Sequence, residues 1–142
     1  MDHVVYLDYK AKELANLIDG KKTKIIRGAM GRKLPYGKVF KDDVLYFVEN
    51  SGDGLIKARA VVDEVYNSEK LTKEDSEKLV EENQESLLLN SGMKKRFAGK
   101  RYLTLITLKE FKAIEPFKLD RSDYGNMDDW LPVEEIDKVK IK

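Results

Sequence analysis

The sequence predicts an α+β fold, a small β-barrel of about five to six strands with flanking helices and a C-terminal tail. The first observation is length, because 142 residues suit one domain with a single hydrophobic core. The second is the order of the predicted elements, which is strand, helix, three strands, helix and strand. The third is that no internal repeat or low-complexity linker divides the chain. The strand count alone leaves an open α+β sheet as an alternative.

The N-terminal part predicts a strand, a helix and a second strand. Residues 3–10 are rich in Val and Tyr and predict the first strand. Apolar residues at i, i+3, i+4 and i+7 within residues 11–18 predict a helix, and Gly20 suits the left-handed residue that often follows one. Residues 22–29 predict the second strand, and glycines and a proline then predict a turn over residues 34–38.

The middle of the chain predicts a β-hairpin and a second helix. Residues 42–50 are mainly apolar, residues 50–54 are rich in turn formers, and residues 55–66 alternate apolar and polar side chains. After these residues the apolar side chains no longer alternate as in a strand and instead follow the spacing of a helix. Thr72 suits the N-cap of a helix that ends near Gln84, and the acidic residues of its first turn favour a helix N-terminus.

The C-terminal part predicts one more strand and then a tail. Residues 91–99 fit a short helix or a turn, and residues 101–111 alternate like a strand. Residues 112–142 look loop-like, with one short helical turn after Pro132. We therefore expect one domain over the whole chain, with a core over residues 3–111 and a C-terminal extension packed on the barrel.

Composition excludes several kinds of chemistry. The chain has no cysteine, which removes disulfides, thiolate nucleophiles and zinc–thiolate sites. His3 is the only histidine, so a histidine-cluster metal site is excluded and a Ser-His-Asp triad is disfavoured. We therefore expect no metal and no cofactor. No signal peptide or membrane-spanning segment is recognisable, which predicts a cytoplasmic protein without a membrane partner.

Positive charge is concentrated in one segment of an almost neutral chain. Residues 20–41 hold eight Lys or Arg and no acid, whereas the net charge of the whole chain is +1. Glycines allow the backbone to approach a phosphate closely, and arginine and tyrosine side chains hold phosphates and stack on bases. The segment predicts a surface that binds RNA or a nucleotide, with an ordinary solvated face as the alternative. The candidate ligand-binding residues are Lys22, Arg27, Arg32, Lys33 and Tyr36.

A short motif in this segment resembles a family signature. The stretch GKKTKIIR, residues 20–27, resembles the signature G-x-K-x-x-E-x-R of the ASCH (activating-signal cointegrator homology) domains. The matching residues are Gly20, Lys22 and Arg27. Thr23 is also common at its position in the family and is a candidate ligand hydroxyl, with an ordinary strand residue as the alternative; Ile25 replaces the acidic residue. The resemblance covers about residues 3–111 and implies a β-barrel of the PUA-like superfamily.

The resemblance implies two functions. Many PUA-like domains bind RNA or modified bases in a cleft beside the helix. One bacterial ASCH branch is similar in sequence but is an amidohydrolase that removes the acyl group from acetylated cytidine. It is thought to use a lysine, a threonine three positions later and a glutamate from the acidic insert. Here the lysine is Lys22, the threonine position holds Ile25, and the glutamate is Glu82 or its neighbour Glu81.

We therefore predict a module of the ASCH and PUA-like type that binds RNA, a nucleotide or a modified nucleoside through a basic cleft beside the first helix. The first alternative is an amidohydrolase that deacylates a modified nucleoside, with Lys22 and Glu82 as its catalytic residues. The second alternative is a protein-interaction adaptor.

Two other segments supply further candidates. Residues 94–101 carry five basic residues around an aromatic ring, and they either extend the positive surface or neutralise the acidic helix. Tyr124 and Trp130 either stack on a base, with Asn126 or Asp128 reading its edge, or close one mouth of the barrel as a hydrophobic latch.

Overall fold

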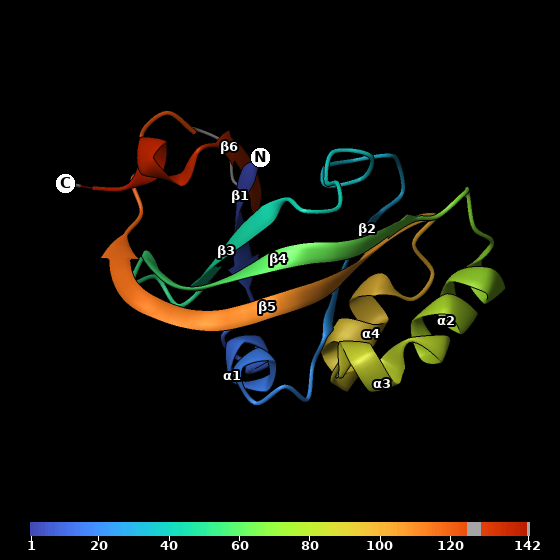
Figure 1. The fold of residues 1–142 in the computed structure, drawn as a ribbon. Helices are drawn as coiled ribbons and strands as arrows, with labels where there is room; N and C mark the ends of the chain where they lie inside the picture. The colour runs from blue at the N-terminus through green and yellow to red at the C-terminus, as the bar shows by residue number, and fades with distance from the viewer. Residues whose placement is uncertain (125–128, 142) are drawn as a thin grey trace.

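The computed structural model describes residues 1–124 and 129–141, and it has the predicted α+β architecture (Figure 1). Within these residues the strands form one six-stranded sheet in the order β2-β5-β4-β3-β1-β6. The strands are β1 (Asp2–Leu7), β2 (Lys24–Ala29), β3 (Val44–Glu49), β4 (Leu55–Asn67), β5 (Tyr102–Lys118) and β6 (Trp130–Glu134). The helices are α1 (Glu13–Ile18), α2 (Lys73–Glu82), α3 (Gln84–Leu87), α4 (Ser91–Phe97) and the 3₁₀ helix η1 (Ile136–Val139).

The sheet is strongly curled and forms a half-barrel with β2 and β6 at its edges (Figure 1). β1 lies parallel to β3, and the other neighbouring strands are antiparallel. Register shifts interrupt the long β4–β5 ribbon at three places, and such bulges bend a strand and increase its twist. The predicted hairpin over residues 42–66 is confirmed as the antiparallel pair β3–β4.

The inner face of the half-barrel holds the main hydrophobic core. Ala58, Ala60 and Val62 belong to the face that the alternation of β4 predicts as buried, and all three are fully buried there. Successive side chains of a strand point to opposite faces. Ile25 of β2 therefore belongs to this core, whereas Ile26 packs against the helical layer on the other side.

In the described part of the chain, α2, α3 and α4 form this helical layer. The buried residues that pack between this layer and the sheet are Ile26, Val80, Leu87, Leu89, Met93, Phe97, Leu103 and Leu105. The predicted N-cap is confirmed, because the Thr72 side chain accepts a hydrogen bond from the backbone N–H of Asp75 at 3.1 Å. α2 ends at Glu82, slightly before the predicted end. None of the described helices is long and apolar enough to cross a lipid bilayer.

The C-terminal tail differs from the prediction. β5 continues past residue 111 to Lys118, and residues 130–134, expected to be a loop, form the edge strand β6 that pairs with β1. Pro132 obscured this strand in the sequence, because a proline cannot donate to a ladder and is tolerated mainly at sheet edges. The helical turn expected after Pro132 is confirmed as η1. The C-terminal extension is thus part of the sheet itself.

Candidate functional site

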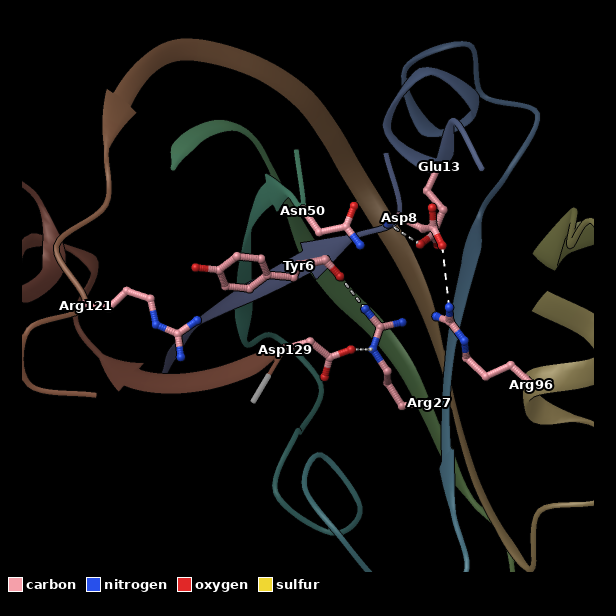
Figure 2. Close-up of a pocket in the computed structure, with 8 residues that line it drawn as sticks. All are labelled: Tyr6, Asp8, Glu13, Arg27, Asn50, Arg96, Arg121 and Asp129. Atoms are coloured by element: carbon pink, nitrogen blue, oxygen red, sulfur yellow. Dashed lines mark hydrogen bonds and ion pairs between the residues drawn. The ribbon is translucent and has the colours of Figure 1, made fainter. Parts of the chain in front are cut away.

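A cavity of about 230 Å³ lies between β1 and β2, two strands that do not pair with each other (Figure 2). We call it the β1–β2 pocket. Its lining residues are Tyr6, Asp8, Glu13, Arg27, Asn50, Arg96, Arg121 and Asp129. Three guanidinium groups and three carboxylates therefore surround one cavity, together with a tyrosine and an asparagine. Such a lining offers both hydrogen-bond donors and hydrogen-bond acceptors to a ligand.

Arg27 bridges β2 to β1 beside this pocket. Its side chain shares the inner face of β2 with Ile25, because the two residues are two positions apart in a strand. One terminal nitrogen donates to the Tyr6 carbonyl of β1 at 2.6 Å, and the other donates to the Ile26 carbonyl at 2.7 Å. Nε lies 3.3 Å from Asp129 Oδ2, yet it is buried without a hydrogen-bond partner among the described residues. The Nε–H group is therefore paired with Asp129 by charge, in a geometry that falls short of a hydrogen bond.

Glu13 enters the pocket from the start of α1. The turn before the helix is fixed by two hydrogen bonds: the Asp8 carboxylate accepts from the Ala11 N–H at 2.9 Å, and the Asp8 N–H donates to Glu13 Oε1 at 2.8 Å. This reciprocal arrangement resembles a capping box, in which an acidic side chain turns back to the preceding backbone. The carboxylate of Glu13 is held at the cavity as a result.

The second oxygen of Glu13 faces Lys22. Glu13 Oε2 lies 3.5 Å from Lys22 Nζ, and the two side chains are only 4% and 1% exposed. Lys22 Nζ also donates to the carbonyl of Leu87 in α3. Burial lowers the pKa of Lys22, and the neighbouring Glu13 carboxylate only partly opposes this effect. A buried, charge-paired lysine beside a cavity is a candidate functional group on physical grounds.

Two further arginines line the pocket from other elements. Arg96 of α4 is 57% exposed and lies 3.7 Å from the Asp8 carboxylate. It belongs to the basic segment over residues 94–101, and so one member of that segment reaches the pocket. Lys94 instead lies 3.4 Å from Glu81 of α2. Arg121 follows β5, and its guanidinium lies 5.3 Å from the centroid of the tyrosine ring in the pocket.

The remaining candidates of the basic segment lie in the adjoining loop after β2. Arg32 is stacked over the rings of Tyr36 and Tyr102, 5.9 and 5.5 Å from their centroids. The Tyr36 hydroxyl donates to the Ser68 carbonyl. Lys33 is exposed in the same loop, where the enclosed space is only about 10 Å³. The basic segment is therefore divided between the β1–β2 pocket and a closely packed loop.

Thr23, Ile25 and Glu82 do not line the pocket. Thr23 is exposed, and its backbone N–H donates to the Ser86 carbonyl at 2.9 Å. Ile25 is fully buried in the main core. Glu82 is exposed on α2 and lies 3.9 Å from Lys78. The carboxylate beside the buried lysine therefore comes from the start of α1 and not from the acidic insert, because α2 directs its charged face to solvent.

Trp130 is a core residue and not a stacking surface for a base. It is 1% exposed in the main core, and its indole N–H donates to His3 Nδ1 at 3.1 Å. This burial agrees with the alternative of a hydrophobic latch. Tyr124 packs against a separate hydrophobic cluster of the described chain. Asn126 and Asp128 lie outside the described residues.

The hydrogen bond from Trp130 fixes the tautomer of neutral His3. Because Nδ1 accepts the indole hydrogen bond, the ring proton of neutral His3 resides on Nε2, which donates to Asp43 Oδ2 at 2.9 Å. Burial lowers the pKa of His3 although Asp43 opposes it. Burial opposes ionisation of Asp43 too, but hydrogen bonds from His3 and the Phe40 N–H outweigh it and lower the pKa of Asp43.

Several pocket residues had no motif to reveal them. The sequence pointed to Lys22 and Arg27, but it gave no reason to single out Asn50, Arg121 or the acids at the start of α1. Their spacing carried no signal, because the acids Asp8 and Glu13 lie five positions apart, whereas the residues of a capping box lie three apart.

Comparison with known proteins supports the fold assignment. No protein-family model matches the sequence, and no curated protein matches it. Among solved structures, the chain is similar to an ASCH protein from Zymomonas mobilis, with a TM-score of 0.69 and 14% identity over 96% of this chain and 91% of that chain. Two mutant forms of that protein match with TM-scores of 0.71 and 0.67 at 14% and 17% identity, covering 93% and 92% of their chains. The chain therefore has the ASCH fold that the motif implied.

Proposed function

We propose that this chain of the ASCH fold binds a nucleotide, either free or as an unpaired nucleotide of an RNA strand, with the base in the β1–β2 pocket. The observation that carries the proposal is the meeting of a buried carboxylate and a buried guanidinium at one cavity. Glu13 offers a fixed acceptor, and Arg27 lines the same cavity with a guanidinium that is 10% exposed and paired with Asp129. Both groups are held by contacts to the backbone, so they are preorganised for a ligand.

A nucleobase suits this lining better than a bare phosphate does. The edge of a base carries amino or imino donors next to carbonyl and ring-nitrogen acceptors, and proteins read them with carboxylates and guanidinium groups. A phosphate carries acceptor oxygens and negative charge, and it would face the carboxylates of Glu13 and Asp129 unfavourably. The mixed lining therefore favours the base as the deeper part of the ligand.

The phosphate of the ligand would meet the exposed arginine. Arg96 is mostly in solvent, and its ion pair with Asp8 is long at 3.7 Å. Exchanging such a weak contact for a phosphate costs little, because exposed ion pairs contribute about 0–1 kcal/mol. A guanidinium binds phosphate oxygens through two parallel hydrogen bonds.

Calorimetric titration of the four ribonucleosides and their 5′-monophosphates at low salt tests the proposal. We expect a preference of about tenfold or more for one base, because one good bidentate base contact contributes about 1–3 kcal/mol of discrimination. Glu13→Gln should reduce that preference. Arg96→Ala should weaken the binding of nucleotides and leave the affinity for nucleosides unchanged.

Arg101→Ala is the matched control, because Arg101 is exposed in the same basic segment and does not line the pocket. Equal effects of Arg96→Ala and Arg101→Ala would remove the phosphate assignment. Failure of every nucleoside and nucleotide to bind at low salt would remove the base-binding proposal altogether.

Hydrolysis of an acylated nucleoside is the second candidate, and the contact between Lys22 and Glu13 favours it. In such a reaction Glu13 would accept a proton from the attacking water, and Lys22 would stabilise the negative charge that develops on the carbonyl oxygen. As the bond between the acyl carbon and the amine nitrogen breaks, Glu13 would return the proton to that nitrogen, and the acyl group would leave as the carboxylic acid. Ile25 occupies the position of the hydroxyl in the similar hydrolases and is fully buried in the core. We therefore rank binding first and expect little deacylation.

Incubation of the protein with acetylcytidine, followed by chromatography of the released cytidine, separates the two candidates. Steady turnover that Glu13→Gln abolishes, in a variant that melts normally, would place hydrolysis first. Absence of turnover together with tight binding of acetylcytidine or cytidine would support a binding module.

A further inference from the structure

A second cavity of about 450 Å³ adjoins the β1–β2 pocket. It is lined by Asp8, Tyr9, Lys10, Asn50, Ser51 and Arg96. Three of these residues also line the first cavity: Asp8, Asn50 and Arg96. The two cavities therefore share a wall, and Figure 2 shows the three shared residues around one side of the pocket.

Resting on the function proposed above, we propose that this second cavity holds the neighbouring nucleotide of a single strand. The ligand of the site is then a strand of at least two nucleotides, with one base in the β1–β2 pocket and the adjacent base on Tyr9.

Tyr9 has the properties of a stacking surface. Its side chain is 55% exposed, so one face of the ring can contact a ligand. Its backbone is fixed on both sides, because the Tyr9 N–H donates to Asn50 Oδ1 at 2.8 Å and its carbonyl accepts from the Lys12 N–H at 3.1 Å. An exposed ring on an anchored turn gives the contact that single-strand binders use, since stacking on an aromatic side chain needs no particular base.

The charges between the two cavities suit a phosphodiester. Arg96 lines both cavities, so a phosphate that links two bound nucleotides would lie beside its guanidinium. Lys10 lines the second cavity, and it forms no ion pair within residues 1–124 and 129–141. The second cavity thus adds a free cation and an aromatic ring to the first, and these are the groups that track a single-stranded backbone.

Calorimetric titration with the four nucleoside 5′-monophosphates and the sixteen ribodinucleotides tests this inference. We expect the best dinucleotide to bind about 5- to 150-fold more tightly than the best mononucleotide, the range that one stacked base provides. Tyr9→Ala should abolish this gain and leave mononucleotide affinity unchanged, whereas Tyr9→Phe should keep the gain.

Tyr66→Ala is the matched control, because Tyr66 is 51% exposed and lines a different cavity. Dinucleotides that bind no more tightly than mononucleotides would overturn the second nucleotide site while leaving the base pocket intact. Equal losses in Tyr9→Ala and Tyr66→Ala would overturn it as well. If neither mononucleotides nor dinucleotides bind, the proposed function fails and this inference fails with it.

Discussion

Replacing Arg27 with methionine should destabilise the fold, because this side chain joins two strands that share no ladder. The change keeps most of the side-chain volume but removes the donors to the Tyr6 carbonyl at 2.6 Å and to the Ile26 carbonyl at 2.7 Å. A hydrogen bond that involves a charged group contributes about 1.5–3 kcal/mol. The hydrogen bond to the Ile26 carbonyl joins neighbouring residues of the chain, and the ion pair with Asp129 involves a mostly exposed carboxylate. Both therefore contribute little to the free energy of unfolding.

We therefore expect a loss of about 3 kcal/mol in the free energy of unfolding. For a chain of this length that corresponds to a fall of about 10 °C in the melting temperature. Since domains are stable by about 5–15 kcal/mol, the variant should still fold. Thermal and urea melts followed by circular dichroism measure the change. Arg96→Met is the matched control, because the same substitution at an exposed arginine should cost less than about 0.5 kcal/mol. A melting temperature for Arg27→Met within about 2 °C of the native protein would refute the bridge between β1 and β2.

Three further perturbations test other parts of the structure. The pKa of His3 is lowered by burial, so below the ordinary value of about 6.5 the unfolded chain binds a proton that the folded chain does not. The free energy of unfolding should therefore fall with decreasing pH, by up to about 1.4 kcal/mol per pH unit. Urea melts at pH 7.5, 6.0 and 5.0 should show this slope for the native protein and not for the control variant His3→Gln. The pKa of Asp43 is also lowered, so further stability should be lost as the pH falls through the acidic range; a flat profile down to pH 3 would contradict both assignments. Lys22→Met should cost about 3–5 kcal/mol because it leaves Glu13 buried and unpaired, and the double change Lys22→Met with Glu13→Gln should recover much of the loss in denaturant melts. Single-stranded RNA should bind with a log–log salt slope near −3 for about four phosphate contacts, measured by titration at several salt concentrations, and an affinity independent of salt would exclude a phosphate-contacting mode.

The predictable part of the site came from local patterns. The signature-like stretch identified Lys22 and Arg27, and both lie at or beside the pocket. The wider basic segment over residues 20–41 also suggested Arg32 and Tyr36, which instead stack on each other in the next loop. Charge density along the sequence cannot separate these two pairs of residues, because strand β2 ends between them and one-dimensional spacing does not record which face each side chain takes.

The sequence by itself determined the order of the strands β1 to β5 and of the helices α1 and α2 among them, and several of their ends. The alternation around Ala58 and Ala60, the Thr72 N-cap and the hairpin over residues 42–66 all depend on interactions within a few residues or on a fixed side-chain period. Tertiary structure alone decided that Trp130 lies in the core and that residues 130–134 form a strand. An edge strand that contains a proline gains its hydrogen bonds and its burial only from a partner more than 120 residues earlier in the chain.

The sequence likewise could not identify Glu13 as the partner of the buried Lys22. Glu13 looks like an ordinary acid in the first turn of a helix, a position that the helix dipole explains without any site. It becomes a pocket residue because the residues after α1 pack against α3, which buries Lys22, while the turn before α1 holds Glu13 as the counter-charge. The composition of the pocket was decided in the same way, by six strands and a helical layer that bring distant segments to one cavity, whereas local periodicity specifies only the elements that carry them.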